Sequence, residues 1–492
     1  MRKFDTIVIG SGIGGLVSAG VLASGGLHTL LIERNGSPGG YLSSFRRRGY
    51  IFDSAVDCIS GAGREGLFQN ILSMLDVDKE IDFVPVEPVR VSIFPDMEIA
   101  VERDVKKYME TLSFLFPSES NGIRRLFSMA DRIHNALQRA ITMRLTGEVS
   151  PERIDPDLLR VMNISYEEFL SEYISDYRLK AVFSDRCPFM GLPPSEVSAL
   201  SMLALIMSYF RYGAYRPVGG FQQLADTLAE GFVRRGGEII FNCTARSIIL
   251  KGTECCGVIS DDGREYLSRD IVSNADFVFT FRDMLGGRYA DIAKKMISSP
   301  GVSTSFFILY CGIRGDAAKY SSMGYFPSYN MEDFFLPGTA FTDNSTIGIT
   351  TASIEDELRA PEGCHTIVVH EMVDSTVGIS DKQALTENLL KRAGTLIPGL
   401  RDRIEIVDAA TPRTLHRYTG NFRGAAFGWR LIPGMADIRR HGIDNLYIAG
   451  HWGDMGGGVL AAAYSGLKAA SEILLKKGIR FEFQNLCSDS GI

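Results

Sequence analysis

Residues 6–33, TIVIGSGIGGLVSAGVLASGGLHTLLIE, contain glycines at a spacing that suits phosphate binding. Gly10, Gly12 and Gly15 give the pattern G-x-G-x-x-G between an apolar run, which predicts a strand, and small apolar residues at helical spacing. In this context the first glycine makes a tight turn, the second lets the backbone approach a pyrophosphate, and the third lets helix and strand pack closely. The partial positive charge of the helix start favours the anion, so the stretch predicts a dinucleotide site.

Glu33 ends the second predicted strand of this unit and indicates which nucleotide fits. Its carboxylate can accept hydrogen bonds from ribose hydroxyls, whereas it would repel a 2′-phosphate. A glycine-rich turn that binds nothing would not explain an acid at this position. The residue therefore favours a dinucleotide other than NADP.

A second stretch, NLYIAGHWGDMGGGVLAAAYSG over 445–466, repeats the order of strand, glycines and helix near the other end of the sequence. Gly456, Gly457 and Gly458 directly precede small residues at helical spacing, and the helix is predicted to stop at Gly478. Such a start presents bare N–H groups to an anion or to the polar edge of a ligand. The sequence thus predicts two ligand-facing helix starts.

The whole chain, in order, resembles the FAD-dependent phytoene desaturases, carotenoid isomerases and retinol saturases, within the wider amine-oxidase-like flavoproteins. Besides the two glycine-rich stretches, the resemblance rests on these segments: ERNGSPGG (33–40), GYIFDSAVDCISGAG (49–63), YRPVGGFQQLADTLAEGFVRRGGEIIFNCTARSI (215–248), DDGREYLSRDIVSNAD (261–276) and TPRTLHRYTGNFRGAAFGW (411–429).

The resemblance implies FAD as the cofactor and gives each helix start a role. Backbone N–H groups near Gly457, Gly458 and Val459 would meet the pyrimidine edge of the flavin, and the helix dipole would stabilise negative charge on the reduced ring. The backbone at Ala245 would lie against the adenine. His451 is the nearest candidate for a covalent flavin link, but non-covalent FAD is expected. The predicted cofactor-binding residues are Gly10, Gly12, Ile13, Gly14, Gly15, Glu33, Arg34, Gly39, Gly40, Tyr41, Ala245, Gly450, His451, Gly457, Gly458 and Val459.

Two positions depart from the pattern of the wider family. Tyr41 stands where many relatives carry an arginine that reaches the FAD phosphates. Ala55 stands two residues after the pair Phe52-Asp53, where the wider family usually has glycine. Arg34 or the run Arg46–Arg48 are alternatives as the compensating charge. For the run, a solvated turn is the preferred interpretation.

Composition sets the broad class of the protein. The chain has 492 residues, 45% of them hydrophobic, and a net charge of −7, which argues against a nucleic-acid partner. Its eight cysteines contain no C-x-x-C pair, so no metal site is expected and a reducing, cytoplasmic location is predicted. The longest charge-free apolar run after the first unit, over 197–210, is too short to span a bilayer.

The distribution of these motifs predicts an α/β fold with two discontinuous domains. A Rossmann-like FAD-binding domain of the GR2 type is expected over 1–88, 215–295 and 405–492. An α+β substrate domain is expected over 89–214 and 296–404, with the flavin in the cleft between the two.

Two segments of the substrate domain bear on its ligand. The run over 117–146 has apolar residues on one helical face and five arginines beside them, which indicates either a core helix with a solvated basic face, the favoured interpretation, or a helix on a membrane surface. The run over 197–212 has methionines and aromatic residues at helical spacing. It is typical of a core helix, and the resemblance implies that it lines a tunnel for a long apolar substrate.

The leading hypothesis is therefore an FAD oxidoreductase acting on carbon–carbon double bonds of a hydrophobic polyene or isoprenoid. Desaturation, saturation and cis–trans isomerisation use the same site, so the direction stays open. A flavin amine oxidase and a non-catalytic prenyl-binding escort protein of the same fold are the alternatives. A second Rossmann unit for NAD(P)H is missing, so electrons are expected to pass to or from a quinone, oxygen or another carrier. Peripheral membrane contact is also expected.

Asp57 is the predicted catalytic residue. It stands in the loop that, by the resemblance, passes the flavin ring, and its neighbours Val56 and Ile59 are apolar. Burial there would raise the pKa of the carboxyl and make it a proton donor or acceptor to substrate carbon. The alternative is that Asp57 only caps the backbone of the loop.

Overall fold

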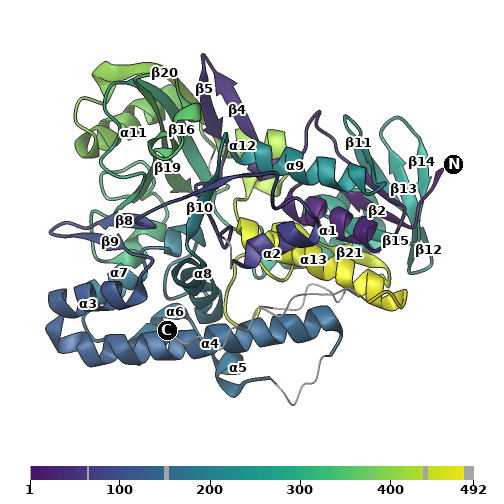
Figure 1. Ribbon diagram of the computed structural model, residues 1–492, viewed down its shortest axis with the longest axis horizontal. Helices are drawn as coiled ribbons and strands as arrows, with labels where there is room; N and C mark the ends of the chain where they lie inside the picture. Colours follow the sequence, from purple (N-terminus) through teal and green to yellow (C-terminus); the bar gives the residue numbers. More distant parts are fainter. Residues whose placement is uncertain (1, 64–65, 149–153, 377, 436–440, 481–492) are drawn as a thin grey trace.

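The computed structural model describes residues 2–63, 66–148, 154–376, 378–435 and 441–480. Two sheets dominate it, and Figure 1 shows them in different halves of the molecule, with the N-terminus at the edge of one half. A parallel five-stranded sheet lies in the half that contains both glycine-rich stretches. A seven-stranded sheet lies in the other half, above a layer of helices.

The five-stranded sheet is built from three separate parts of the chain. All its neighbouring strands are parallel, in the order β11 (Glu238–Ile240), β3 (Thr29–Ile32), β2 (Thr6–Ile9), β15 (Asp270–Ser273) and β21 (Leu446–Ile448). Strands β2 and β3 are buried on both faces, as apolar runs of this kind require. One face packs on helices α1 (Ile13–Ser24), α2 (Leu67–Met74), α9 (Phe221–Arg234) and α13 (Val459–Lys476).

The other face of this sheet is covered by a smaller sheet and two helical segments. The small sheet has the order β1 (Arg2–Lys3), β14 (Glu265–Leu267), β13 (Glu254–Ser260) and β12 (Ala245–Lys251). A π-helix over Phe279–Leu285 and helix α10 (Ala290–Ser298) complete the layer. This arrangement confirms the predicted α/β, Rossmann-like fold.

The seven-stranded sheet has one face against a helix and the other toward the centre of the molecule. Its order is β20 (Ile404–Ala410), β16 (Ser305–Arg314), β19 (Cys364–Val373), β18 (Ile347–Thr350), β17 (Ser322–Tyr325), β8 (Arg90–Ile93) and β9 (Glu98–Val101). Helix α11 (Lys382–Leu396) covers the outer face with its buried leucines. The predicted domain boundary at residue 405 falls inside β20, which pairs with β16 of this sheet.

Shorter elements connect the two halves. A hairpin pairs β4 (Ser44–Arg47) with β5 (Tyr50–Asp53), and a small sheet has the order β6 (Ile59–Ser60), β10 (Ala214–Pro217) and β7 (Phe83–Pro85). The remaining helices are α3 (Val105–Leu115), α4 (Ser120–Thr146), α5 (Pro156–Val161), α6 (Tyr166–Ser171), α7 (Tyr177–Phe183), α8 (Ala199–Tyr212) and α12 (Pro412–Thr419).

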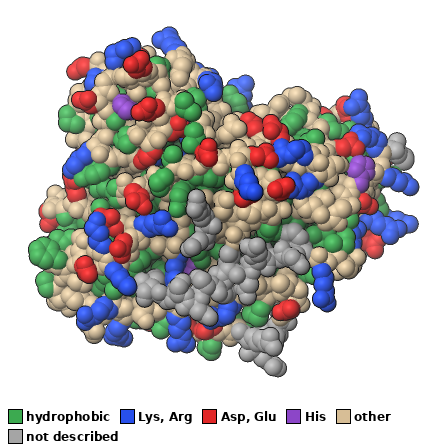
Figure 2. Space-filling model, viewed as in Figure 1, with side chains coloured by type: hydrophobic (Ala, Val, Ile, Leu, Met, Phe, Trp, Pro, Cys, Tyr) green, Lys and Arg blue, Asp and Glu red, His purple; other side chains and the backbone are tan. Residues whose placement is uncertain are grey.

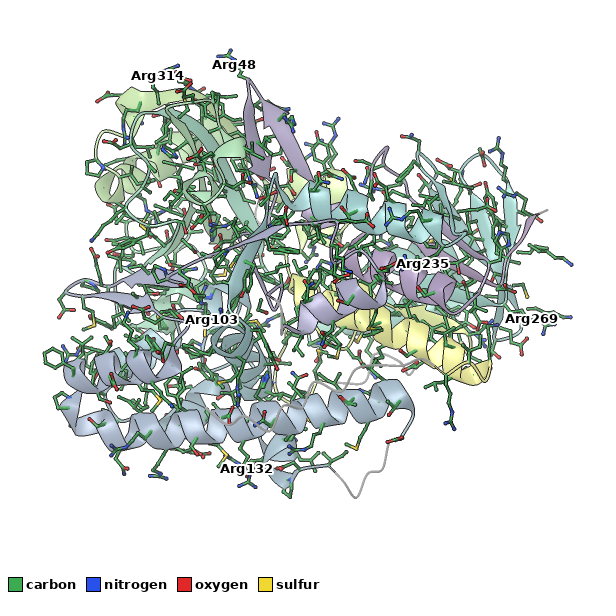
Figure 3. The ribbon with its side chains drawn as sticks, in the orientation of Figure 1. Arg48, Arg103, Arg132, Arg235, Arg269 and Arg314 are labelled. Carbon is green, nitrogen blue, oxygen red and sulfur yellow. The ribbon has the colours of Figure 1, made fainter. Side chains whose placement is uncertain are left out.

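The long helix α4 is a core helix with a solvated basic face, as the favoured interpretation of its sequence predicts. Ile123, Leu126 and Phe127 are buried in the cluster that also contains much of α8. Arg132 on the opposite side is exposed and points away from the molecule in Figure 3. Because its apolar face already packs inside the protein, α4 does not offer that face to a membrane.

The described surface has a mixed character. On the visible face in Figure 2, basic and acidic side chains alternate over the part of the chain that is coloured. No helix among the described residues combines the length and the apolar character that crossing a membrane requires.

Helices α1 and α13 cross in close contact because two glycines meet. A Cβ atom at Gly466 would lie 2.1 Å from the carbonyl oxygen of Gly14, so any side chain there would force the helices apart. The same crossing brings the N-terminal ends of both helices to the same end of the sheet.

We therefore expect Gly466→Ala to lower the free energy of unfolding by about 1–3 kcal/mol, the range for overpacking a tight site. Gly394→Ala is the matched control, because Gly394 lies in α11 and its Cβ would meet no atom within 4 Å. That control should gain about 0.5–1 kcal/mol from reduced backbone entropy. Urea unfolding of both variants measures the difference, and equal stabilities would contradict the close contact.

Candidate functional site

A cavity of about 760 Å³ lies where the carboxyl ends of the parallel strands face the seven-stranded sheet. Residues directly after β2, β3, β15 and β21 line it, as do side chains from β16, β18 and β19. Ligands of open parallel sheets bind at this end of the strands, where the backbone turns from strand to helix. The cavity therefore continues from the first half of the molecule into the second.

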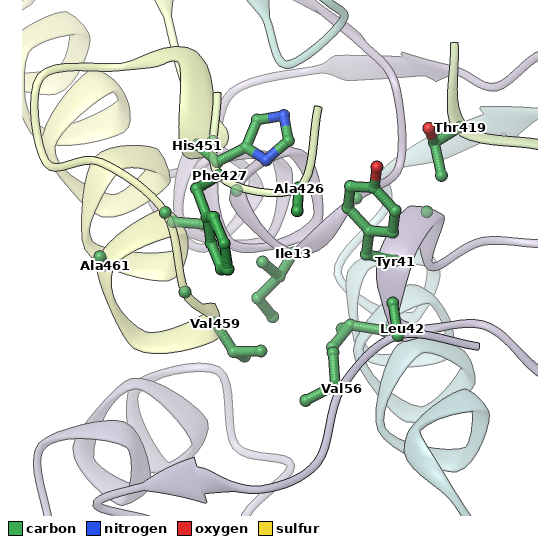
Figure 4. Close-up of a pocket in the computed structure, with 18 of the residues that line it drawn as sticks. Ile13, Tyr41, Leu42, Val56, Thr419, Ala426, Phe427, His451, Val459 and Ala461 are labelled. Carbon is green, nitrogen blue, oxygen red and sulfur yellow. The ribbon is translucent and has the colours of Figure 1, made fainter. Parts of the chain in front are cut away.

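Both glycine-rich helix starts line this cavity. Helix α1 has Gly12 at its N-cap and α13 has Gly458, and neither cap has a side-chain hydrogen bond. The first N–H groups of the two helices thus keep donor capacity for a ligand, with the partial positive charge of each helix behind them. Figure 4 shows the pocket walls, with Ile13 between one side formed by His451, Phe427, Val459 and Ala461 and another formed by Tyr41, Leu42 and Val56.

The glycines at the two helix starts have different surroundings. Gly458 has φ +97°, and a Cβ there would meet no protein atom within 4 Å, so the position faces open space. Gly12 lies against Asn274, whose side-chain nitrogen would be 2.9 Å from an added Cβ. Gly15 has the third predicted role: its Cβ would lie 1.9 Å from the carbonyl oxygen of Gly10, and it is not among the cavity residues.

Glu33 is buried at the edge of the cavity and held by the phosphate-binding loop itself. One carboxylate oxygen accepts hydrogen bonds from the backbone N–H of Ser11 at 2.8 Å and from its hydroxyl at 2.5 Å. The other accepts from the backbone N–H of Asn35 at 2.8 Å. The acid at the end of β3 therefore also fixes the shape of the loop.

The structure brings together fifteen of the sixteen predicted cofactor-binding positions, all except Gly15, around this one cavity. Ala245 lines it from β12, as the resemblance implies, and Arg34 lines it while donating to the backbone carbonyl of Arg417. The run Arg46–Arg48 lies exposed in the β4–β5 hairpin, and Arg48 points away from the molecule in Figure 3. This position favours the solvated turn for the run.

Tyr41 and His451 are held by neutral hydrogen bonds. The Tyr41 hydroxyl donates to the carbonyl oxygen of Ala425 at 2.9 Å, and burial raises the pKa of this phenol to about 12. Nε2 of His451 lies 3.0 Å from the side-chain oxygen of Asn421, and burial lowers the pKa of this imidazole to about 4. Trp452 donates to the same Asn421 oxygen at 2.8 Å, so Asn421 fixes this wall of the cavity.

Asp57 lines the cavity, but the predicted rise of its pKa is wrong. Arg216 donates to its Oδ1 at 2.5 Å and Ser322 donates to its Oδ2 at 2.8 Å. Burial acts to raise the pKa of the carboxyl, yet the charge and hydrogen bonds of Arg216 and the hydrogen bond from Ser322 outweigh it and lower the pKa. Asp57 is therefore an ionised partner of a buried arginine that also pairs with Glu355 at 2.7 Å, and it holds no proton to donate.

Two of the cavity residues that were not predicted from the sequence follow a strand of the parallel sheet. Asn274 and Asp276 follow β15 in the stretch SNAD, at the same end of the sheet as the glycine loop. Burial raises the pKa of Asp276 to about 6, and its carboxylate accepts from the backbone N–H groups of Phe279 and Phe422. Their place just after a strand of the parallel sheet is the signal that could have identified them.

Comparison with known sequences gives relatives over nearly the full chain. Prolycopene isomerase 1, chloroplastic, of an Oncidium hybrid cultivar is 26% identical over 97% of this chain and 85% of its own length. All-trans-retinol 13,14-reductase of Rattus norvegicus is 27% identical, over 99% and 88%. Phytoene desaturase (lycopene-forming) of Pseudescherichia vulneris is 25% identical, over 96% and 99%.

The model of the flavin containing amine oxidoreductases matches residues 13–279, more than half of the chain. This chain belongs to that family. The match confirms the predicted resemblance, the FAD cofactor and the oxidoreductase class. The crystal structure of an oxidoreductase from Methanosarcina mazei has the same fold, with a TM-score of 0.64 at 18% identity, over 96% of this chain and 100% of that one.

The ion pair of Asp57 generates a stability prediction. Asp57→Asn removes a charge that faces the fully buried Arg216, so the free energy of unfolding should fall by roughly 3 kcal/mol at neutral pH. Because the folded pKa is lower than the unfolded one, this contribution is present above the unfolded pKa and disappears as the pH falls through the folded value.

Urea unfolding between pH 7 and pH 3 checks this expectation. Asp408→Asn is the control, because Asp408 forms an exposed pair with Arg47 at 3.5 Å and should change stability by less than about 1 kcal/mol. A neutral effect of Asp57→Asn would show that the carboxylate does not hold Arg216.

Proposed function

We propose that this flavoprotein oxidises, reduces or isomerises carbon–carbon double bonds of a hydrophobic polyene. The observation that carries the proposal is the continuity of the cavity from the two glycine helix starts into a region lined by apolar side chains of three different elements. Those side chains include Leu137 and Ile141 of α4, Ala204 and Leu205 of α8, and Phe306, Ile308 and Val368 of the large sheet. The names of the relatives, which refer to carotenoids and retinol, support the same substrate class.

The residues present fit FAD, because both helix starts have N–H groups without a side-chain cap and Gly458 faces open space. We propose that the α1 start, from Gly12, holds the pyrophosphate, that Glu33 binds a ribose, and that the α13 start, from Gly457, holds the flavin edge. When bound, FAD supplies hydride transfer between its ring and a substrate carbon.

The residues of the chain itself bind and orient the substrate. The apolar walls from α4, α8 and the sheet exclude water and favour a long apolar ligand over an ionic one. Arg216 pairs with both Asp57 and Glu355 beside this region, so each of these carboxylates bonds to a buried cation of the protein, and the group keeps one net negative charge. We assign Asp57 a positioning role in place of proton transfer, since both carboxylate oxygens accept hydrogen bonds.

An anaerobic half-reaction tests the proposed function. The purified protein, with its FAD reduced by dithionite, is mixed with all-trans-retinol or with lycopene isomers, and the flavin absorbance and the polyene products are followed. Reoxidation of the flavin by a polyene, or polyene isomerisation, supports the proposal. Reaction only with amines, on oxidised FAD, would support the amine-oxidase alternative, and a purified protein without flavin would support the escort alternative.

Glu33→Gln tests the cofactor end of the cavity. The amide keeps the size of the side chain but loses the charged acceptor, so FAD should bind at least about tenfold more weakly. Glu238→Gln is the control, because Glu238 lies on the adjacent strand β11 in an exposed pair with Arg2. Titration of both apoproteins with FAD gives the affinities, and equal values would contradict the role of Glu33.

Membrane contact and a cytoplasmic location remain predictions. The buried apolar face of α4 leaves the exposed apolar side chains at the end of α3, Phe114 and Leu115, as the better candidate for a contact with lipid. Flotation of the protein with anionic liposomes would check this contact.

A further inference from the structure

The inner face of the seven-stranded sheet forms the far wall of the cavity. Side chains alternate along its strands, so Phe307, Ile367 and Val369 pack toward α11 while their neighbours face the cavity. The cavity-facing set consists of Phe306 and Ile308 on β16, Thr350 on β18, and Thr366, Val368 and His370 on β19. Three of these six side chains are polar, which is unexpected for a wall that faces a pure hydrocarbon.

The side chain of His370 has room against the sheet because its strand neighbour is a glycine. It pairs in register with Gly348 of β18, and its Nε2 lies 2.1 Å from the position where a Cβ of Gly348 would be. Phe189 and Phe306 approach the imidazole edge to face, with ring centroids 6.1 and 5.6 Å away. The glycine and the two rings thus fix the imidazole flat against the sheet at the cavity wall.

The imidazole is neutral and has unused hydrogen-bonding capacity. Burial and the nearby charge of Arg90 lower the pKa of His370 to about 4, against the opposite effect of Asp57. A neutral ring has one donor and one acceptor nitrogen. Within the described chain, neither nitrogen of His370 has a hydrogen-bond partner, whereas the other cavity histidines do: His134 with Tyr212, His416 with the backbone of Asn421, and His451 with the side chain of Asn421.

Two hydroxyls elsewhere on the same wall of the cavity also have unused hydrogen-bonding capacity. Thr366 precedes it by four residues on the same face of β19, and Thr350 lies on the next strand, paired with Val368. Among the described residues, neither threonine hydroxyl has a hydrogen-bond partner. A hydrocarbon seated here would desolvate all three polar groups without replacing the hydrogen bonds to water.

The position of His370 relative to the flavin end of the cavity defines which part of a substrate it meets. Phe427 packs on Gly457 at the α13 start, and its ring lies 5.8 Å from that of Phe306, which in turn contacts His370. Two aromatic rings therefore separate the imidazole from the glycines. A group bound by His370 belongs to a part of the ligand away from the reacting carbons.

We propose that His370 determines substrate specificity by hydrogen bonding to an oxygen function of the polyene, on a wall that also carries the hydroxyls of Thr350 and Thr366. The substrate class is then an oxygenated polyene, such as an alcohol or a carbonyl compound, in place of a bare hydrocarbon. This inference rests on the proposed function, and it selects among the substrates which that function allows. Sites that bind a substrate hydroxyl reject analogues without it, because their own polar groups then stay unpaired.

Equilibrium binding to the FAD-loaded protein tests the inference without turnover. The probes are all-trans-retinol and its deoxy analogue, a hydrocarbon that lacks only the hydroxyl, and their absorption shifts report binding. The wild-type protein should bind the alcohol at least about tenfold more tightly than the hydrocarbon. His370→Phe should abolish this preference, mainly by weaker binding of the alcohol and tighter binding of the hydrocarbon.

His365→Phe is the matched control, because His365 lies on the same strand but outside the cavity lining, where it contacts the Ser353 hydroxyl at 3.0 Å. It should keep the preference for the alcohol. His370→Gln, which retains a donor and an acceptor, should keep it in part. If His370→Phe does not fold, nitrogen NMR of labelled histidine in the wild-type protein replaces it: retinol, but not the hydrocarbon, should shift the His370 resonance.

Equal binding of both probes by the wild-type protein, a preserved preference in His370→Phe, or an unchanged His370 resonance with retinol would overturn the inference. These results would leave polyene chemistry at the flavin intact. Binding of neither probe to the FAD-loaded protein would instead contradict the proposed function, and with it the inference. The two failures are therefore distinguishable.

Discussion

The contact between Gly14 and Gly466 is the constraint on which the site depends. It lets α1 and α13 cross with backbone against backbone, so that their N-terminal ends converge at the carboxyl ends of β2 and β21. Two partial positive charges and two sets of free N–H groups then face one cavity. A bulkier residue at Gly466 would separate the helix starts, and the cavity would lose the arrangement that fits a pyrophosphate at one end and a flavin ring at the other.

The buried charges beside this cavity are paired with one another. Arg216 lies between Asp57 and Glu355, and Arg359 lies between Asp53 and Asp356. Both arginines are almost completely buried, so each would be costly without its carboxylates. These triads connect the loop after β5 with the segment before β19, and so they hold the two halves of the molecule together while leaving an apolar interior.

The large sheet contributes both apolar and polar side chains to the cavity wall. Strand alternation directs one set of side chains to α11 and the other to the ligand space, so the identity of every second residue on β16 and β19 determines what the space can bind. A glycine opposite His370 lets an imidazole lie flat where a larger side chain would exclude it. Polarity at this wall is thus compatible with an otherwise apolar lining.

The sequence by itself determined the cofactor end of this protein, because the groups that bind there are mostly backbone. A strand, a glycine pattern and a helix start are local features, so Gly10, Gly12 and Gly458 could be recognised from spacing alone, and the acid at Glu33 follows from the same local unit. The same holds for the buried face of α4, whose periodicity is local.

Only the tertiary structure decided the ionisation state of Asp57, the sheet to which β20 belongs and the surroundings of His370. Arg216 lies far from Asp57 in the sequence and reverses the pKa shift that apolar neighbours predict. The pairing of β20 with β16 places β20 in the large sheet. The register of His370 with Gly348 places the imidazole against a residue without a side chain. Electrostatic partners and strand neighbours come from distant segments, and their effect depends on distance in space, which the order of residues does not contain.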